Sequence, residues 1–334
     1  MTDPPPARPA GASALARGTS LWRYLRYGAW PLYLALLGWW TWEYGVPYTD
    51  DLVLCWLIGA LLAAAVHSGD SWHAGLLVLR DWLPVAAVLW TYALLRGYAA
   101  HTPWPPRLQP QLAIDTVLGA GETWTVRLQH ALYTPGRPRV YDYAAVAVYM
   151  THFFAVFVLL AVLWRRDRRR FRRLLAGYLV LTYAAFATYV LYPAVPPWLA
   201  AEEGNMPEVT RVVTDVLVHS GLPRAASVFE NGSRFANDVA AMPSLHAAYP
   251  MLITLFLWPT AGRRTRPLLV AYPVAMAVVL VYGGEHFVVD IALGWLYAAA
   301  AYLGVERLLA RRAARRPTPT AAEARADNRV DGPR

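Results

Sequence analysis

Long apolar runs recur along the chain and are separated by shorter polar segments. A helix that crosses a bilayer needs roughly 20 predominantly apolar residues, and about eight runs approach that length and composition. They lie at residues 28–44, 52–67, 74–98, 141–164, 174–192, 243–260, 268–284 and 287–309. The pattern predicts an all-α fold, a polytopic membrane helical bundle with about eight transmembrane helices.

Arginine clusters follow alternate runs. Arg165–Arg173 joins the fourth run to the fifth, Arg263–Arg266 joins the sixth to the seventh, and residues 311–316 follow the eighth. Counting crossings puts these clusters on one side, which the positive-inside rule makes cytoplasmic. We therefore expect a multi-pass protein of the cell membrane with both termini in the cytoplasm.

The two ends of the chain differ from the apolar middle. Residues 1–20 are rich in Pro, Ala and Gly and lack the apolar core of a signal peptide. We predict disordered cytoplasmic tails at 1–20 and 311–334. Residues 21–310 are predicted to form a single transmembrane catalytic domain.

Composition supports a membrane protein and argues against a nucleic-acid-binding protein. The chain is 57% hydrophobic and 16% charged, and it contains 15 Trp and 20 Tyr, which suits aromatic belts at the interfaces. The net charge of +9 comes from arginines at the ends of apolar runs rather than from a basic folded surface. All 31 basic residues are Arg, typical of a bacterial genome rich in G and C. The single cysteine, Cys55, excludes a Cys-based metal site.

Two longer connections are predicted to face the outside. Residues 99–140 include a stretch at 114–133 that mixes apolar and polar side chains, and it is interpreted as an amphipathic helix in the interface. Residues 193–241 form the other outer connection. Three groups of polar residues lie at the outer ends of predicted spans, where ionisable side chains are by default functional candidates.

The first group begins the sixth span with the sequence Ala-Met-Pro-Ser-Leu-His, residues 241–246. Pro243 suits the first turn of a helix. Free amides at the helix start, together with the Ser244 hydroxyl and Leu245, would form a cradle for an anion. His246 in the same turn is placed to give a proton to a leaving oxygen.

The second group begins the eighth span with Gly-Gly-Glu-His-Phe-Val-Val-Asp, residues 283–290. His286 and Asp290 are four residues apart and share a helix face. A carboxylate there can fix the imidazole tautomer and leave the other ring nitrogen nucleophilic.

The third group ends the fifth span at Tyr192 and continues through Pro196-Pro197-Trp198. The prolines stiffen the exit from the helix, and Trp198 suits the headgroup level. Each group alone is more typical of an ordinary helix end. All three at one depth indicate phosphoryl transfer, because that chemistry requires two histidines, a carboxylate and a phosphate-sized cradle.

The three groups, in this order, resemble the type 2 phosphatidic acid phosphatase superfamily, particularly its branch containing inositol phosphorylceramide synthase. The resemblance covers about residues 186–295 through Pro196-Pro197-Trp198, Pro243-Ser244-Leu245-His246 and the His286–Asp290 spacing. It implies that His286 attacks phosphorus, that Asp290 orients His286, and that His246 protonates the departing oxygen. It implies no metal and no cofactor.

The sequence also departs from the phosphatase branch. The first motif carries no Lys, and Leu280 occupies the place of an Arg six residues before His286. Fewer fixed cations suit a phosphodiester better than a phosphomonoester. Arg211, Arg224 and Arg234 are candidates to supply charge instead, although solvated loop arginines are the ordinary alternative.

Other polar residues have two readings. His152 lies within the fourth span and is either a buried structural histidine or part of the substrate lining. Glu285 and Asp238 are candidates to bind an acceptor hydroxyl. Arg80 and Asp81, near the inner end of the third span, are interpreted as interfacial residues.

The leading hypothesis is a lipid phosphotransferase, inositolphosphotransferase-like, with its site on the extracytoplasmic face. Its partners would be the membrane, a lipid with a phosphate headgroup, and a hydroxyl acceptor such as a polyol or lipid. The alternative is a phosphatase of the same superfamily, with water as acceptor, acting on phosphatidate-like or polyprenyl phosphate lipids. A transporter or flippase is a third hypothesis, but no internal repeat is visible.

Overall fold

The part of the chain that the structure describes is built from helices. A computed structural model describes residues 11–45, 47, 49–67, 72–99, 103–221 and 237–315, and these contain two isolated β-bridges but no strand. The elements are α1 (Gly11–Tyr44), α2 (Asp50–His67), α3 (Trp72–Ala99), α4 (Gln109–Leu118), α5 (Trp124–Leu132), α6 (Val140–Arg166), α7 (Arg168–Leu191), α8 (Pro197–Glu202), α9 (Val212–His219), α11 (Leu245–Leu257), η1 (Trp258–Thr260), α12 (Arg266–Tyr282) and α13 (Val288–Ala314). The predicted all-α class is confirmed.

Four stretches of these helices are long and apolar enough to cross a membrane. They are His73–Gly97, Val140–Arg166, Arg168–Leu191 and Val288–Ala314, while Asp51–His67 and Arg266–Tyr282 are apolar but shorter. The predicted count of eight spans is not confirmed. At about 1.5 Å per residue, the 13 residues of α11 are too short to cross a hydrocarbon core of roughly 30 Å.

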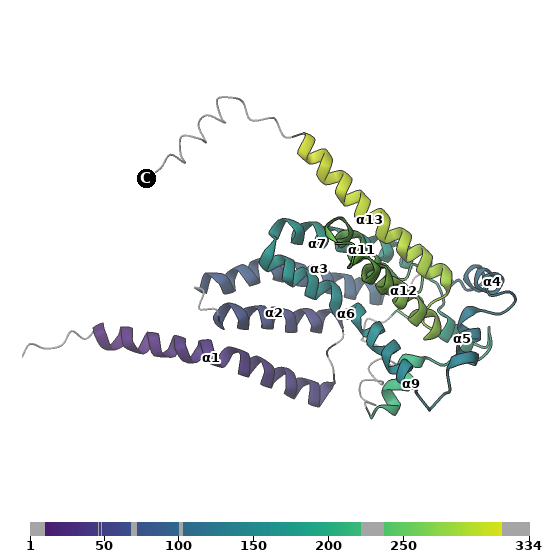
Figure 1. Cartoon of the computed structure of the whole chain (residues 1–334), viewed down its shortest axis with the longest axis horizontal. Helices are drawn as coiled ribbons and strands as arrows, with labels where there is room; N and C mark the ends of the chain where they lie inside the picture. Colours follow the sequence, from purple (N-terminus) through teal and green to yellow (C-terminus); the bar gives the residue numbers. More distant parts are fainter. Residues whose placement is uncertain are drawn as a thin grey trace, which may run out of the picture.

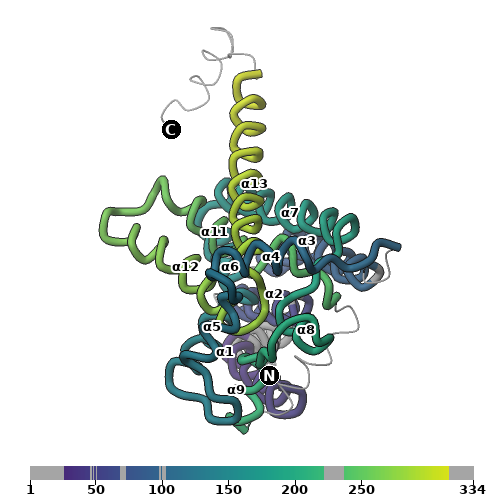
Figure 2. The backbone as a smooth tube through the Cα atoms, turned by 90° about the vertical axis from the view of Figure 1, so that its right-hand side faces the viewer, coloured from purple at the N-terminus to yellow at the C-terminus, as the bar shows by residue number. Residues whose placement is uncertain are grey.

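α11 and α13 form the centre of the bundle. They pack against each other, α7 contacts both, and α6 and α12 flank α11. The first three helices pack in succession, with α2 against α6 and α3 against α7 (Figure 1). The C-terminal end of α13 projects beyond the other helices (Figure 2).

α3 is fastened to the junction of α6 and α7. Trp82 is fully buried against Trp164 and Phe171, with ring centroids 6.4 and 5.5 Å apart. Asp81 accepts a hydrogen bond from Trp164 Nε1 at 2.9 Å and pairs with Arg168. The Asp81 carboxylate thus joins three helices, in addition to the interfacial position predicted for it.

The arginine-rich connection is almost entirely helical. Only Asp167 interrupts α6 and α7, and its Oδ1 accepts from the Arg169 and Arg170 amides at 3.0 and 2.9 Å. Because a carboxylate caps the orphan amides of a helix start, one residue is enough to turn the chain.

The predicted amphipathic helix at 114–133 is two helices. α4 ends at Leu118, and Thr123 caps α5 by accepting from the Val126 amide. At Gly119 an added Cβ would lie 1.9 Å from the Glu122 carbonyl oxygen, so the turn closes only with glycine there. Helical structure also extends into both predicted tails, because α1 begins at Gly11 and α13 ends at Ala314.

Candidate active site

The start of α11 is held by its two neighbours. Ser244 is the N-cap, and its Oγ accepts from the Ala247 amide at 3.2 Å. The Ser244 amide donates to the Asp290 carbonyl at 3.0 Å, and Tyr189 Oη donates to the Pro243 carbonyl at 2.8 Å. These bonds fix the first turn of α11 and therefore the position of His246.

The second histidine lies just before α13, which begins at Val288. His286 Nδ1 lies 3.6 Å from Asp290 Oδ2, and the same oxygen accepts from the Phe287 amide at 3.0 Å. Asp290 is fully buried and His286 is 6% exposed. The two side chains are therefore neighbours, as predicted. The expectation that they share a helix face is wrong, because His286 precedes α13 and only Asp290 lies in its first turn.

A tight turn ahead of His286 joins it to the Pro-Pro-Trp element. Gly284 has a φ of +77°, and an added Cβ there would lie 2.7 Å from Val209 Cγ1. The Gly284 carbonyl accepts from the Trp198 amide at 3.0 Å. Two segments far apart in sequence are therefore bonded directly through a glycine in the left-handed region.

Asp115 in α4 supports the start of α13 from outside the predicted motifs. Its carboxylate is fully buried and accepts from the Val288 amide at 3.0 Å and from the Trp124 amide at 2.9 Å. Burial raises the pKa of the Asp115 carboxyl, and the two amide donors oppose that rise. Asp115 thus satisfies orphan amides at the starts of α5 and α13.

Replacing Asp115 with alanine is expected to lower the free energy of unfolding by about 2 kcal/mol, because two buried amides lose a charged acceptor. Thermal unfolding of the detergent-solubilised protein measures the change. Glu122→Gln is the control, since that side chain is 39% exposed in the neighbouring turn. Equal unfolding temperatures for the two variants would contradict the capping role of Asp115.

Three histidines lie in a row at the site. The ring centroids of His152 and His246 are 3.9 Å apart and nearly parallel, and those of His246 and His286 are 5.7 Å apart. Tyr149 stacks on His246 at 5.0 Å, and Tyr249 stacks on His152 at 5.1 Å. The two predicted catalytic histidines, which are 40 residues apart in sequence, are therefore neighbours.

Arg211 forms a fixed ion pair on one side of these rings. Its Nε and Nη2 donate to the Glu285 carboxylate at 2.8 and 3.1 Å, and its guanidinium lies 4.6 Å from the centre of the Trp198 ring. Burial would lower the pKa of Arg211, but the Glu285 carboxylate raises it above its ordinary value. Arg211 is thus a partly buried cation paired with Glu285, and not a solvated loop arginine.

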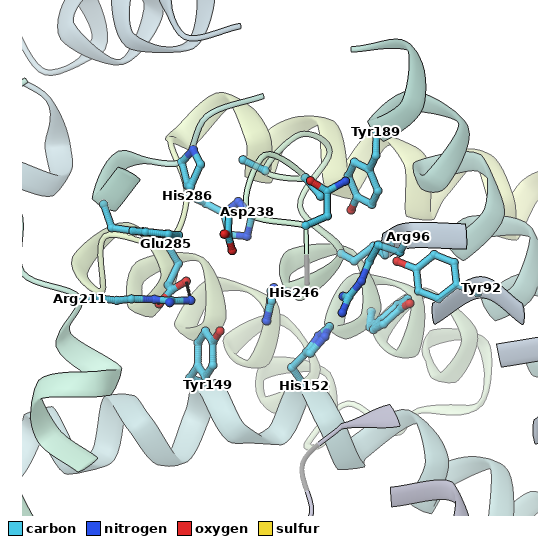
Figure 3. A pocket seen from close by; sticks show the side chains of 17 residues that line it. Tyr92, Arg96, Tyr149, His152, Tyr189, Arg211, Asp238, His246, Glu285 and His286 are labelled. Carbon is cyan, nitrogen blue, oxygen red and sulfur yellow. Dashed lines mark hydrogen bonds and ion pairs between the residues drawn. The ribbon is translucent and has the colours of Figure 1, made fainter. Parts of the chain in front are cut away.

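A cavity of about 200 Å³ connects these groups (Figure 3). The predicted residues that line it are Leu245, His246, His286, His152, Trp198, Arg211, Glu285 and Asp238. Ser244, Pro197, Tyr192 and Asp290 are not among the described residues that line it. Arg224 and Arg234 lie outside the described residues. His152 lines the cavity, and its stacking on His246 is compatible with both of its sequence-based readings.

Sequence reasoning missed seven other lining residues, namely Tyr92, Arg96, Tyr149, Tyr189, Asn237, Ala240 and Tyr249. Arg96 could have been selected from the sequence, because it is an ionisable residue inside a predicted span. The tyrosines could not have been selected, since many tyrosines occupy the apolar runs. The described residues contain no group of three or more His, Cys, Asp or Glu side chains that could hold a metal ion.

Comparison with known proteins finds one matching family and one related protein. Residues 112–304 match the sequence profile of the PAP2 superfamily. The phosphoinositol dihydroceramide synthase of Bacteroides thetaiotaomicron is 27% identical over 182 residues. That alignment spans 50% of this chain and 58% of the relative, so it covers little more than half of the relative's length. No solved structure matches the chain.

Proposed function

The chain belongs to the PAP2 (type 2 phosphatidic acid phosphatase) superfamily, and from that premise we propose that it is a membrane-embedded lipid phosphotransferase. Membership and the relative's name support an enzyme of lipid phosphate chemistry in a multi-pass membrane protein. One observation is the main support for a phosphotransferase. His246 and His286 line the same cavity, and Asp290 lies beside His286.

In the first step, His286 Nε2 attacks the phosphorus of the lipid donor. Asp290 faces Nδ1 and holds the ring in the tautomer with a free Nε2. The bond between phosphorus and the oxygen of the diacylglycerol moiety breaks, and His246 gives its proton to that oxygen. The products are a phosphohistidine that carries the headgroup and a free neutral lipid.

In the second step, His246 takes the proton of an acceptor hydroxyl, and that oxygen attacks the phosphohistidine. A new phosphodiester forms, and the bond from phosphorus to His286 breaks. The relative's name supports an inositol phosphate headgroup and an acceptor of the dihydroceramide type. The Glu285 and Asp238 carboxylates line the cavity and provide acceptors for polyol hydroxyls.

The active site is proposed to face the extracytoplasmic side. α11 and α13 begin at the cavity, and α7 ends close to it at Leu191. The arginine-rich connections at residues 165–173 and 263–266 lie at the opposite ends of these helices, as does the end of α13 (Figure 1). The positive-inside rule places those ends in the cytoplasm.

The test is product identification with the purified protein in liposomes. Phosphatidylinositol and dihydroceramide are supplied, together and separately, and every phosphorus-containing product is identified by mass spectrometry. A new lipid phosphodiester that requires both substrates and disappears in His286→Ala supports transfer. Inorganic or inositol phosphate, released without dihydroceramide, would make the protein a phosphatase or a phospholipase. Products that survive His286→Ala would reject the mechanism.

A further inference from the structure

One wall of the cavity comes from outside the segment that matches the superfamily. Tyr92 and Arg96 line the cavity from α3, whereas the match begins at residue 112. Figure 3 shows Arg96 and Tyr92 on one side of His246 and His152, with Arg211 and Glu285 on the other. The N-terminal helices therefore contribute to the site and are more than a membrane anchor.

α3 is held in a fixed position relative to the catalytic helices. Tyr183 Oη on α7 donates to the Val88 carbonyl at 2.8 Å. Tyr92 packs edge-on against Tyr183 and Phe186, with ring centroids 6.0 and 6.1 Å apart. Arg96 is one helical turn after Tyr92, so these contacts fix the part of α3 from which its side chain extends.

One of the two cavity arginines, Arg211, has its charge balanced within the site. Two nitrogens of Arg211 donate to one carboxylate, that of Glu285, so the net charge of the pair is close to zero. Arg96 lies in the last turn of α3, at the end of the apolar stretch His73–Gly97, and it lines the cavity from there. A cation at a helix end reaches the headgroup region, which is the depth of a lipid phosphate.

We propose that Arg96 binds the anionic phosphodiester of the lipid donor beside His246 and His286, which makes it a substrate-binding and specificity-determining residue. The inference rests on the proposed function. A guanidinium fork matches two non-bridging phosphate oxygens in a bidentate manner. One such cation suits a phosphodiester with a single charge, and it stabilises the further charge that develops during attack on phosphorus. α3 thereby completes an active site whose catalytic groups all lie in the superfamily segment.

The first test compares Arg96→Gln, Arg96→Lys and Arg80→Gln. Arg80 is on the same helix with a side chain that is 78% exposed, so Arg80→Gln is the matched control. Arg96→Gln is expected to lower kcat/KM for transfer about 100-fold, the range seen when one transition-state donor is removed. Arg96→Lys keeps the charge but loses the fork, and its kcat/KM is expected to lie between those of wild type and Arg96→Gln.

A second measurement separates charge recognition from a structural effect. Hexadecyl methylphosphonate carries one negative charge, and its O-methyl ester carries none; both are used as competitive inhibitors of transfer. The wild-type protein is expected to bind the anion more tightly than the ester, and Arg96→Gln is expected to lose that preference. A merely distorted cavity would weaken both inhibitors alike, and that result would overturn the proposal.

These outcomes are distinct from failure of the proposed function. If the wild-type protein forms no transfer product, the function itself is wrong. If wild type transfers and Arg96→Gln matches Arg80→Gln in kcat/KM and inhibitor preference, only the role of Arg96 is wrong.

Discussion

His286→Ala is expected to abolish headgroup transfer, with a loss of at least about 10⁴-fold in kcat, because the covalent route has no other attacking group. His246→Ala removes a general acid and base, and its expected loss is smaller, about 10²–10⁴-fold. Asp290→Asn keeps the shape of the side chain but removes the negative charge beside His286 Nδ1. Its loss in kcat is therefore expected to lie between those of His246→Ala and His286→Ala.

The intermediate provides the direct measurement. A donor with radioactive phosphorus should label the wild-type protein on a group that is acid-labile and stable to alkali, as expected of phosphohistidine. His286→Ala should take up no label, while His130→Ala, an exposed histidine on α5, should label like wild type. Labelled His286→Ala together with unlabelled His246→Ala would move the nucleophile to His246.

Gly294→Leu is expected to have the second largest effect, because α13 touches α11 at this residue. A Cβ at Gly294 would lie 2.4 Å from the Ser244 carbonyl oxygen, and backbone cannot move aside as a flexible side chain can. The two helix starts that carry His246 and His286 must then separate. A displacement of about 1 Å can cost about 100-fold in activity, and overpacking costs roughly 1–3 kcal/mol of stability.

Gly304 on the same helix offers a matched control, since nothing lies within 4 Å of a Cβ placed there. Gly304→Leu should leave transfer unchanged and raise the unfolding temperature slightly, because leucine has the higher helix propensity. The measurements are the rate of headgroup transfer and the thermal unfolding temperature of Gly294→Leu and Gly304→Leu. Similar activity losses at Gly294 and Gly304 would show that the effect comes from the lipid-facing surface and not from the α11–α13 contact.

The sequence by itself determined the class of fold and identified candidates for the reacting groups. Apolar runs bounded by arginines require helices in a membrane, because only internally satisfied backbone is stable in hydrocarbon. The motifs around His246 and His286 could be recognised because each is local, with its members within one or two helical turns. The same locality predicted that His286 and Asp290 are neighbours, but not the reason. His286 precedes α13, and the turn at the N-cap Phe287 brings it to Asp290.

Only the tertiary structure decided what surrounds these groups. The Gly294–Ser244 approach, the caps from Asp115 and the Arg211–Glu285–Trp198 arrangement join segments that no local pattern relates. Arg96 shows the same limit, because nothing in α3 indicates which helix its guanidinium will face. Periodicity specifies which face of a helix is apolar, but the neighbour of that face is chosen by packing across the whole bundle. The candidate catalytic residues could therefore be proposed from sequence, and the cavity that His246 and His286 line could not.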